Sequence, residues 1–168
     1  MENDKFPKRK QIRLKEYDYS TDGAYFVTIC TKDKKHIFWN KNGKLVGANC
    51  VRPQEEKLSL IGRIIDNEIK GIDGIYDNII RIDKYVIMPN HIHMIILIDK
   101  NNGRTQFAPT VSRIIKQFKG AVTKKIGKSI WQRSFYEHII RNEIEYAEIW
   151  NYIDSNPSKW AEDEYYSD

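Results

Sequence analysis

The chain has 168 residues, of which 40% are hydrophobic and 12% aromatic. This length suits one domain and this apolar content can bury a core, so we expect a single domain over residues 1–168 and exclude extended intrinsic disorder. No apolar run approaches the roughly 18 residues of a membrane span, and the N-terminal end lacks the apolar stretch of a signal peptide, so we expect a cytoplasmic protein with no membrane partner. Cys30 and Cys50 are the only cysteines, which excludes a disulfide framework and a Cys-x-x-Cys zinc site.

The charge is unevenly distributed along the chain. Lys and Arg number 28 against 23 Asp and Glu, a net charge of +5. Cations gather in a basic N-terminal segment (about 1–20) and in residues 110–128, which hold no acid, whereas the tail (about 161–168) is acidic. Two interpretations fit the basic stretches: contacts to a phosphate polyanion, or a solvated helix face.

The first half of the chain contains a strand, a long loop and a helix by its residue pattern. Residues 24–31 (AYFVTICT) follow a Thr-Asp-Gly turn signal and are rich in β-branched and aromatic side chains, which predicts a strand. Residues 32–57 contain Asn-Gly and scattered polar residues and are expected to form a loop or hairpin excursion. Apolar residues at helical spacing predict an amphipathic helix over residues 58–72.

The second half predicts three more strands and two helices. Residues 79–88 alternate and then become continuously apolar (YVIM), and after Pro-Asn residues 91–98 continue as a second strand, which indicates two strands joined in a hairpin. Residues 111–126 carry apolar side chains at helical spacing, with the basic residues largely off that stripe. Residues 130–140 predict a fourth strand, and 142–156 a final helix that Asn can cap and Asn-Pro ends.

The predicted order β-α-β-β-α-β-α matches the ferredoxin-like βαββαβ pattern followed by an added C-terminal helix. We therefore expect an α+β fold with a four-stranded antiparallel sheet, two helices on one face and the other face available. The strand 91–98 would be central in that sheet. Because side chains alternate along a strand, its wholly apolar set should face the helices and its two histidines, His91 and His93, the opposite face.

The pair His91 and His93 is the first candidate for chemistry. Same-side Cβ atoms two residues apart on a strand are roughly 7 Å apart, so both imidazoles can reach one metal ion. A histidine pair of this kind also occurs on strands without a metal, so a third ligand is needed from elsewhere. In the last helix, Tyr152 and Asn156 lie one turn apart beside a stripe that should dock on the domain. Packing and helix termination are the plain alternatives for these two. The stripe consists of Tyr146, Ile149, Trp150 and Ile153.

Three segments carry a family resemblance. The run Tyr85-Val86-Ile87-Met88-Pro89-Asn90-His91-Ile92-His93 resembles the histidine-hydrophobic-histidine signature of single-tyrosine HUH transposases. The run Trp131-Gln132-Arg133-Ser134-Phe135-Tyr136-Glu137-His138-Ile139-Ile140-Arg141 and the later Tyr152-Ile153-Asp154-Ser155-Asn156-Pro157 resemble the REP-associated tyrosine transposases, a branch of that family. The resemblance extends from about residue 24 to residue 160.

This resemblance implies a metal-dependent enzyme that cleaves and rejoins single-stranded, hairpin-bearing DNA. It assigns Tyr152 as the nucleophile, which would form a covalent 5′-phosphotyrosine, and His91, His93 and Asn156 as ligands of Mg²⁺ or Mn²⁺. The chemistry is consistent, because a phenol with a pKa of about 10 needs a cation or base to attack at neutral pH. A bound divalent ion offsets charge on the scissile phosphate. Family members act as homodimers or as monomers, and both states remain open.

Other residues have competing interpretations. Tyr136 is an alternative nucleophile, although Tyr152 has the helical partner and the family match. His138 is expected to be structural rather than a ligand, and His36 to be a solvated residue or a phosphate contact. The candidates for contacts to the DNA backbone are Arg113, Lys116, Lys119 and Lys124. Arg133 and Arg141 are further options.

Two other functions remain open at this stage. One is a non-catalytic module that binds single-stranded nucleic acid, since ferredoxin-like sheets commonly do so through aromatic residues. The chain lacks the aromatic, Gly-rich signature of RNA-recognition domains, and a pure binder has no need of two adjacent histidines. The other is a relaxase or replication initiator with identical chemistry, for which the chain is short.

Overall fold

Four antiparallel strands form one sheet in the order β2-β3-β1-β4. The computed structural model describes residues 22–40, 57–99 and 109–166. The basic segment 1–20 and residues 41–56 of the expected long loop lie outside this part. The two central strands are the expected ones, so the sequence-based topology is confirmed. The strands are β1 (Gly23–Cys30), β2 (Ile80–Ile87), β3 (His91–Ile98) and β4 (Tyr136–Ile140).

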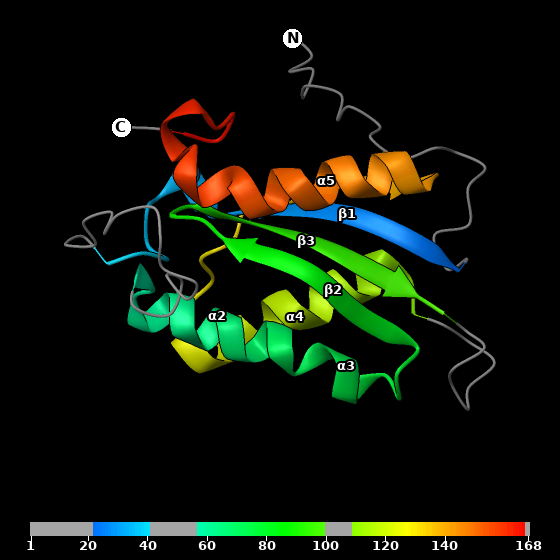
Figure 1. Ribbon diagram of the computed structural model, residues 1–168. Helices are drawn as coiled ribbons and strands as arrows, with labels where there is room; N and C mark the ends of the chain where they lie inside the picture. Colours follow the sequence, from blue (N-terminus) through cyan, green and yellow to red (C-terminus); the bar gives the residue numbers. More distant parts are fainter. Residues whose placement is uncertain (1–21, 41–56, 100–108, 167–168) are drawn as a thin grey trace, which may run out of the picture.

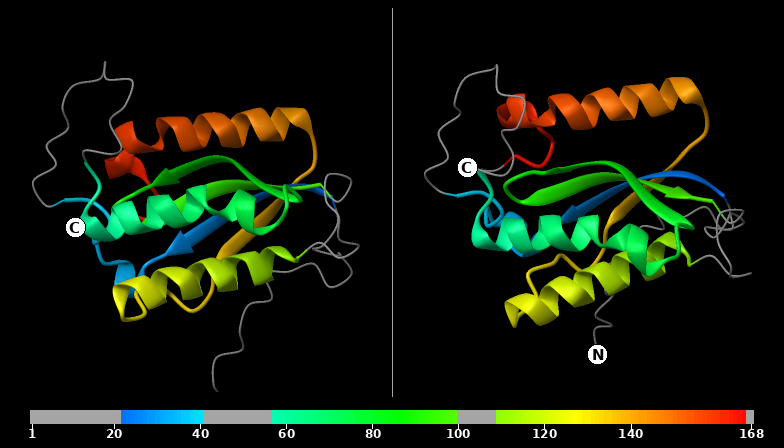
Figure 2. Two further views of the ribbon diagram at one scale, coloured as in Figure 1. Left: turned by 90° about the horizontal axis from the view of Figure 1, so that it is seen from below. Right: turned by 60° about the horizontal axis from the view of Figure 1, so that its bottom comes forward.

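Helices cover both faces of this sheet (Figure 1). The helices α2 (Leu60–Lys70), α3 (Ile72–Ile75) and α4 (Val111–Ile126) lie on one face, where α2 and α4 run side by side (Figure 2). The helix α5 (Glu143–Ser155) crosses the other face. Short 3₁₀ turns are η1 (Lys32–Lys34), η3 (Asn156–Ser158) and η4 (Trp160–Glu162). None of the helices in the described ranges combines the length and apolar character needed to cross a bilayer.

Side chains cap the starts of the three long helices. The hydroxyl of Ser59 accepts from the amide of Gly62 at the start of α2, and Thr110 and Asn142 play the same part for α4 and α5. These caps satisfy amide groups that have no partner within the helix. Gly127 ends α4 with φ of 80°, a left-handed conformation that glycine adopts without strain.

Alternation along β3 produces two separate apolar layers. Ile92, Met94, Ile96 and Ile98 belong to the larger core, which α2 and α4 cover. Ile95, on the opposite face, belongs to a smaller core with residues of α5. The division agrees with the expectation that the apolar set of β3 faces the helix pair.

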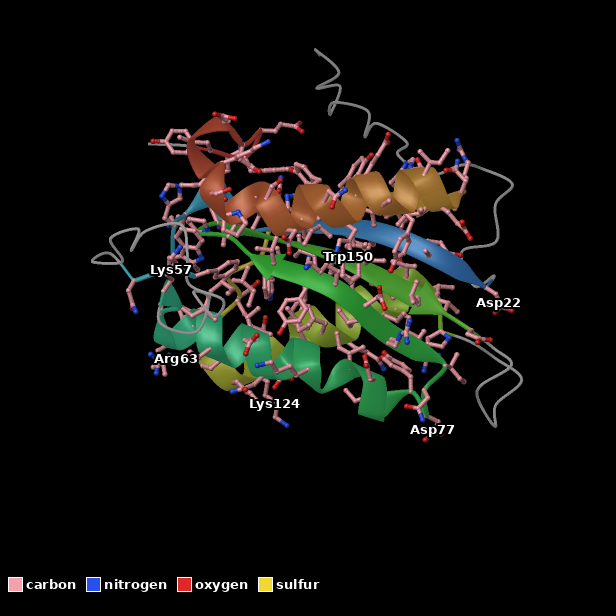
Figure 3. The ribbon with its side chains drawn as sticks, viewed as in Figure 1. Asp22, Lys57, Arg63, Asp77, Lys124 and Trp150 are labelled. Carbon is pink, nitrogen blue, oxygen red and sulfur yellow. The ribbon has the colours of Figure 1, made fainter. Side chains whose placement is uncertain are left out.

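The face that carries the histidines is partly covered by α5. The four residues of its expected docking stripe, Tyr146, Ile149, Trp150 and Ile153, all contribute to the smaller core. Trp150 lies between the helix and the sheet (Figure 3). The expectation that this face remains available is therefore wrong for the part beneath α5, because the apolar stripe of α5 needs an apolar surface to bury.

The fourth strand is shorter than the expected 130–140. β1 pairs with β4 through Thr28 and Tyr136, and an isolated bridge joins Thr31 to Trp131. Between these two pairs β1 advances three residues while the facing chain spans five, so two extra residues bulge out of the ladder. The strand pattern of the side chains cannot show this, because a bulge changes backbone pairing and leaves composition unchanged.

The helix expected over 58–72 is also divided. Leu58 pairs with Trp39 in an isolated bridge, so the helix starts only after the Ser59 cap. The backbone leaves the regular helix at Gly71 before the single turn of α3.

Two glycines provide a matched test of this packing. A Cβ at Gly62 would overlap the backbone carbonyl oxygen of Phe38, whereas a Cβ at Gly120 in α4 would meet no atom of the described residues within 4 Å. We expect Gly62→Ala to lower the free energy of unfolding by about 1–3 kcal/mol through this overlap. Gly120→Ala should raise it by up to about 1 kcal/mol, because alanine restricts the unfolded chain and favours the helix. Urea denaturation measures both, and a change of the same sign in the two variants would contradict this assignment.

Candidate metal and nucleophile site

Two buried histidines of β3 form the centre of the candidate site. His91 and His93 are 0% and 1% exposed, and their Nε2 atoms lie 3.0 Å apart. The antiparallel register places Thr28 of β1 opposite His93, where its hydroxyl lies 2.8 Å from Nδ1. The Nδ1 of His91 lies 2.8 Å from Oδ1 of Asn90. Both imidazoles are therefore held through Nδ1, with Nε2 directed towards the other ring.

These partners decide which ring nitrogens are free to bind a cation. The amide nitrogen of Asn90 donates to the carbonyls of Lys34 and Tyr165, so its oxygen faces His91 and accepts from Nδ1–H. The Nε2 of His91 therefore carries a free electron pair. The Thr28 hydroxyl can donate or accept, so it supports His93 with its proton on either nitrogen. Both Nε2 atoms can thus be free at once, as shared binding of one ion requires.

Tyr152 reaches the histidines from α5. Its hydroxyl lies 3.1 Å from Nε2 of His93 and 3.3 Å from Oδ2 of Asp163. The residue as a whole is 40% exposed, so it lies at the surface while its hydroxyl contacts the buried histidine pair. The ring of Phe26 stacks on His93 and meets the rings of Tyr152 and Tyr136 edge-on. Tyr136 thus lies near the site, but it is the hydroxyl of Tyr152 that contacts a histidine.

Asn156 joins this cluster at the end of α5. Its side chain is buried and its Nδ2 donates to Oδ2 of Asp163 over 2.8 Å. Its Oδ1 has no hydrogen-bond partner among the described residues. A buried polar atom without a partner costs free energy, so this oxygen is suited to accept a hydrogen bond or to bind a cation.

Asp163 lies at this site, although the sequence pattern did not identify it as a candidate residue. Its Oδ1 lies 3.9 Å from Nε2 of His91, and the carboxylate forms a cluster with His91 and His93 whose ligand atoms lie within 4.8 Å of one another. The neighbouring residues Glu162 and Glu164 are also acidic. Nothing in the sequence singles out the middle one, because the 3₁₀ turn η4 decides which carboxylate turns inward.

Burial controls the titration of these groups. Burial lowers the pKa of His91 to about 3, helped by the positive charge of Lys34. Burial, followed by the charge of His91, also lowers the pKa of His93. Both histidines are therefore neutral at pH 7 and able to act as ligands. The pKa of Tyr152 is raised, first by burial and then by the charge of Asp163, so its phenol is protonated at neutral pH.

The donor set fits a divalent cation. Two neutral imidazoles and a carboxylate lie close enough together to share one ion. The amide of Asn156, whose oxygen has no partner among the described residues, bonds to that carboxylate. Imidazole and carboxylate together suit Mn²⁺, and the oxygens suit Mg²⁺ as well. Four such donors also leave coordination positions of an octahedral ion open for a substrate oxygen.

The cationic helix α4 lies across the sheet from this site. Arg113, Lys116 and Lys124 are exposed on α4, and Lys124 lies in the helix layer opposite α5 (Figure 3). Lys119 is different, because its ammonium donates to the backbone carbonyls of Gln132 and Ser134. Those carbonyls belong to the bulge before β4, so this lysine stabilises the fold there.

The two arginines that were candidates for DNA contacts lie near opposite ends of β4, and the two other histidines lie outside the candidate metal site. Arg133 is exposed on the bulge, at the end of the sheet where the histidines lie. Arg141 follows the other end of β4. His138 pairs with Glu145 over 2.6 Å, as a structural histidine would, and lies outside the cluster. His36 is exposed and its ring meets Trp160 edge-on.

Comparisons with known proteins show which proteins this chain is similar to. The family model described as "Transposase IS200 like" matches residues 63–156. An uncharacterized protein of Haemophilus influenzae is 36% identical over 95% of this chain and 94% of its own length. The REP-associated tyrosine transposase of Escherichia coli is also 36% identical, over 49% of this chain and 47% of its own length. The solved structure of a REP-associated tyrosine transposase bound to a REP hairpin has a TM-score of 0.59 at 23% identity and covers 88% of this chain and 74% of that one. That likeness concerns the fold.

The buried neutral histidines predict a pH-dependent stability. In the unfolded chain histidine titrates near pH 6.5, whereas the folded pKa of His91 is about 3 and that of His93 is also lowered. The unfolded state therefore binds more protons below pH 6.5. Between pH 6.5 and pH 5 the metal-free protein should lose about 1–2 kcal/mol of its free energy of unfolding through His91, and His93 should add to this loss. Urea denaturation in EDTA across this range measures the loss. His91→Gln should reduce the slope while His36→Gln, at an exposed position, leaves it unchanged; equal slopes in all three proteins would refute the assignment.

Proposed function

The chain belongs to the IS200-like family of transposases, enzymes that act on DNA, and we propose that it cleaves and rejoins single-stranded, hairpin-bearing DNA through a covalent 5′-phosphotyrosine on Tyr152. One observation carries this proposal: the Tyr152 hydroxyl lies 3.1 Å from a buried, neutral histidine whose partner is a second histidine. A merely packed tyrosine has no need of this neighbour.

The residues that would hold the divalent ion are His91, His93 and Asn156. The two Nε2 atoms and the partnerless Oδ1 of Asn156 supply three ligands, and Oδ1 of Asp163 is placed to supply a fourth. Bound there, Mg²⁺ or Mn²⁺ polarises the scissile phosphate and offsets the charge that builds on its oxygens. Asp163 also orients the amide of Asn156, because it accepts from Nδ2 and so leaves Oδ1 free.

The chain's own residues perform the proton and bond transfers. Oδ2 of Asp163, 3.3 Å from the Tyr152 hydroxyl, accepts the phenolic proton. The phenolic oxygen then bonds to phosphorus, and the bond from phosphorus to the 3′-oxygen of the preceding nucleotide breaks. That oxygen takes up the proton that Asp163 accepted and leaves as a 3′-hydroxyl. The energy of the phosphodiester is kept in the tyrosine link, so a 3′-hydroxyl can reverse the step without ATP.

The proposed substrate is a single strand that folds into a hairpin. The Escherichia coli relative is named for an association with REP sequences, and the solved neighbour is bound to a REP hairpin. Tyr152 is 40% exposed, so an unpaired strand leaving a hairpin can reach this residue from the surface.

The nucleophile is tested by substitution. We expect Tyr152→Phe to abolish a covalent adduct with labelled hairpin oligonucleotides taken from DNA flanking the gene, because it removes only the attacking oxygen. The adduct is observed on a denaturing gel after incubation with Mn²⁺. Anisotropy measurements should show DNA affinity within about twofold of the unsubstituted protein.

Tyr136→Phe is the matched control, since Tyr136 shares the contact with Phe26 but not the contact with His93. It should retain the adduct. An adduct that survives Tyr152→Phe and disappears in Tyr136→Phe would move the nucleophile to Tyr136. Tight binding with no adduct from any flanking hairpin would favour the non-catalytic binding module.

Metal binding is tested without DNA. Mn²⁺ at about 100 times its dissociation constant should raise the free energy of unfolding by about 2.7 kcal/mol, because the ion binds the folded state alone. Thermal unfolding with and without Mn²⁺ gives the shift, and calorimetry gives the affinity. His91→Ala should abolish the shift, and Asn156→Ala should weaken binding at least tenfold. His138→Ala is the control that should leave it unchanged; a full shift in His91→Ala would disprove the proposed ligand set.

A further inference from the structure

A second pocket lies beside the histidine site. It has a volume of about 650 Å³ and is formed where β1 ends, between η1 and the bulge before β4. Its lining includes Cys30, whose backbone pairs with His91 across the sheet. The volume lies within the range of about 300–1,000 Å³ that is typical of small-ligand sites. The mechanism above makes no use of this pocket.

Two backbone irregularities build the pocket. On one side, Asp33 and Lys34 adopt left-handed conformations with φ of 59° and 51°. On the other, the amide of Gln132 still donates to the carbonyl of Cys30, and the bulge follows from Arg133 on. The ammonium of Lys119 holds the carbonyls of Gln132 and Ser134. Left-handed non-glycine residues persist only where their surroundings hold them, and they cluster at ligand sites. The shape of the pocket is thus fixed before any ligand arrives.

The charge of the pocket suits an anion. Lys32, Lys34 and Arg133 line it and are exposed, against one carboxylate, that of Asp33. Arginine and lysine in this arrangement recognise phosphate. The side chains of Ser129 and Gln132 also line the pocket and provide donors and acceptors of the kind that pair with a base edge.

Tyr165 lies between the pocket and the histidine site and contacts both. It lines the pocket, and its ring centroid lies 4.7 Å from that of His91 and 5.8 Å from that of His93. Its carbonyl accepts from the amide of Asn90, the residue that orients His91. A chain molecule with its phosphate at the histidines can therefore extend directly into the pocket.

We propose that this pocket binds one unpaired nucleotide of the DNA strand, the nucleotide adjoining the scissile phosphate. The inference rests on the proposed function, and it adds where the strand lies and what selects it. The scissile phosphate stays at the histidines, and the other phosphate of the bound nucleotide contacts Lys32, Lys34 and Arg133. The base of this nucleotide lies within the pocket against Tyr165 and Trp131. A base stacked in a duplex cannot enter, because it must first be turned out of the helix. The pocket thus contributes to selection of single strands.

Abasic scanning tests this proposal. The Tyr152→Phe protein keeps the strand intact, so its affinity is measured by anisotropy with hairpin oligonucleotides that lack one base at each position around the cleavage point. We expect a loss of about tenfold at one position next to the scissile phosphate, since base stacking on aromatic side chains contributes to single-strand affinity. Adding Arg133→Ala should weaken binding of the intact strand and reduce the abasic penalty at that position to less than threefold.

Arg63→Ala is the matched control, because Arg63 is an exposed arginine on α2 in the helix layer across the sheet from α5 (Figure 3). It should leave the abasic penalty at tenfold. As a second readout, 5-iododeoxyuridine at the sensitive position should crosslink on irradiation to the peptide that contains Trp131 or to the one that contains Tyr165.

The outcomes separate this proposal from the proposed function. Two results would overturn the pocket assignment alone, provided that the adduct on Tyr152 forms. One is that no abasic position lowers the DNA affinity, and the other is that Arg133→Ala leaves the loss of affinity at the abasic position unchanged. A crosslink to any other peptide would overturn it as well. Failure of the protein to bind hairpin single strands would overturn the proposed function and this inference together.

Discussion

Alternation of side chains along β3 is the constraint on which the rest of the structure depends. One face of this central strand is wholly apolar and is buried beneath α2 and α4. The register with β1 and β2 is therefore strongly specified, since a slip by one residue would bring His91 and His93 into the larger core. The histidines lie on the opposite face as a consequence of this packing.

The helix α5 turns this histidine face into an enclosed site. Its stripe of Tyr146, Ile149, Trp150 and Ile153 packs on the smaller core, and the rotation that buries this stripe brings Tyr152 and Asn156 towards β3. The proposed nucleophile and the partnerless amide oxygen thus come from α5 and from the residue that caps it, so their positions depend on the same helix. Errors in the docking of α5 would displace both together, which ties the chemistry to the packing of an aromatic cluster.

Burial has opposite effects on the two kinds of group at this site. It holds the histidines neutral, which prepares them to bind a cation, and it raises the pKa of the Tyr152 phenol, which makes attack at neutral pH harder. A cation bound to His91 and His93 favours the phenolate, and Asp163 offers an acceptor for its proton. The attack by Tyr152 that we propose therefore depends on the cation that we propose for the histidine pair.

The sequence by itself determined the order of the elements, the central place of β3 and the face on which the histidines lie. These depend on residue periodicity, which is local and can be read directly. The docking stripe of α5 was predicted for the same reason. The bulge before β4 was not, because it depends on how two segments far apart in sequence pair, and neither segment alone contains that information.

Only the tertiary structure brought Asp163 into the site and built the pocket around Arg133. The turns after α5 choose one acid among three neighbours, and the side chain of Lys119 holds the bulge from a different helix. Both outcomes depend on contacts between residues distant in sequence. Residue type and spacing indicate which groups are capable of chemistry, whereas the packing of the whole chain decides which of them meet.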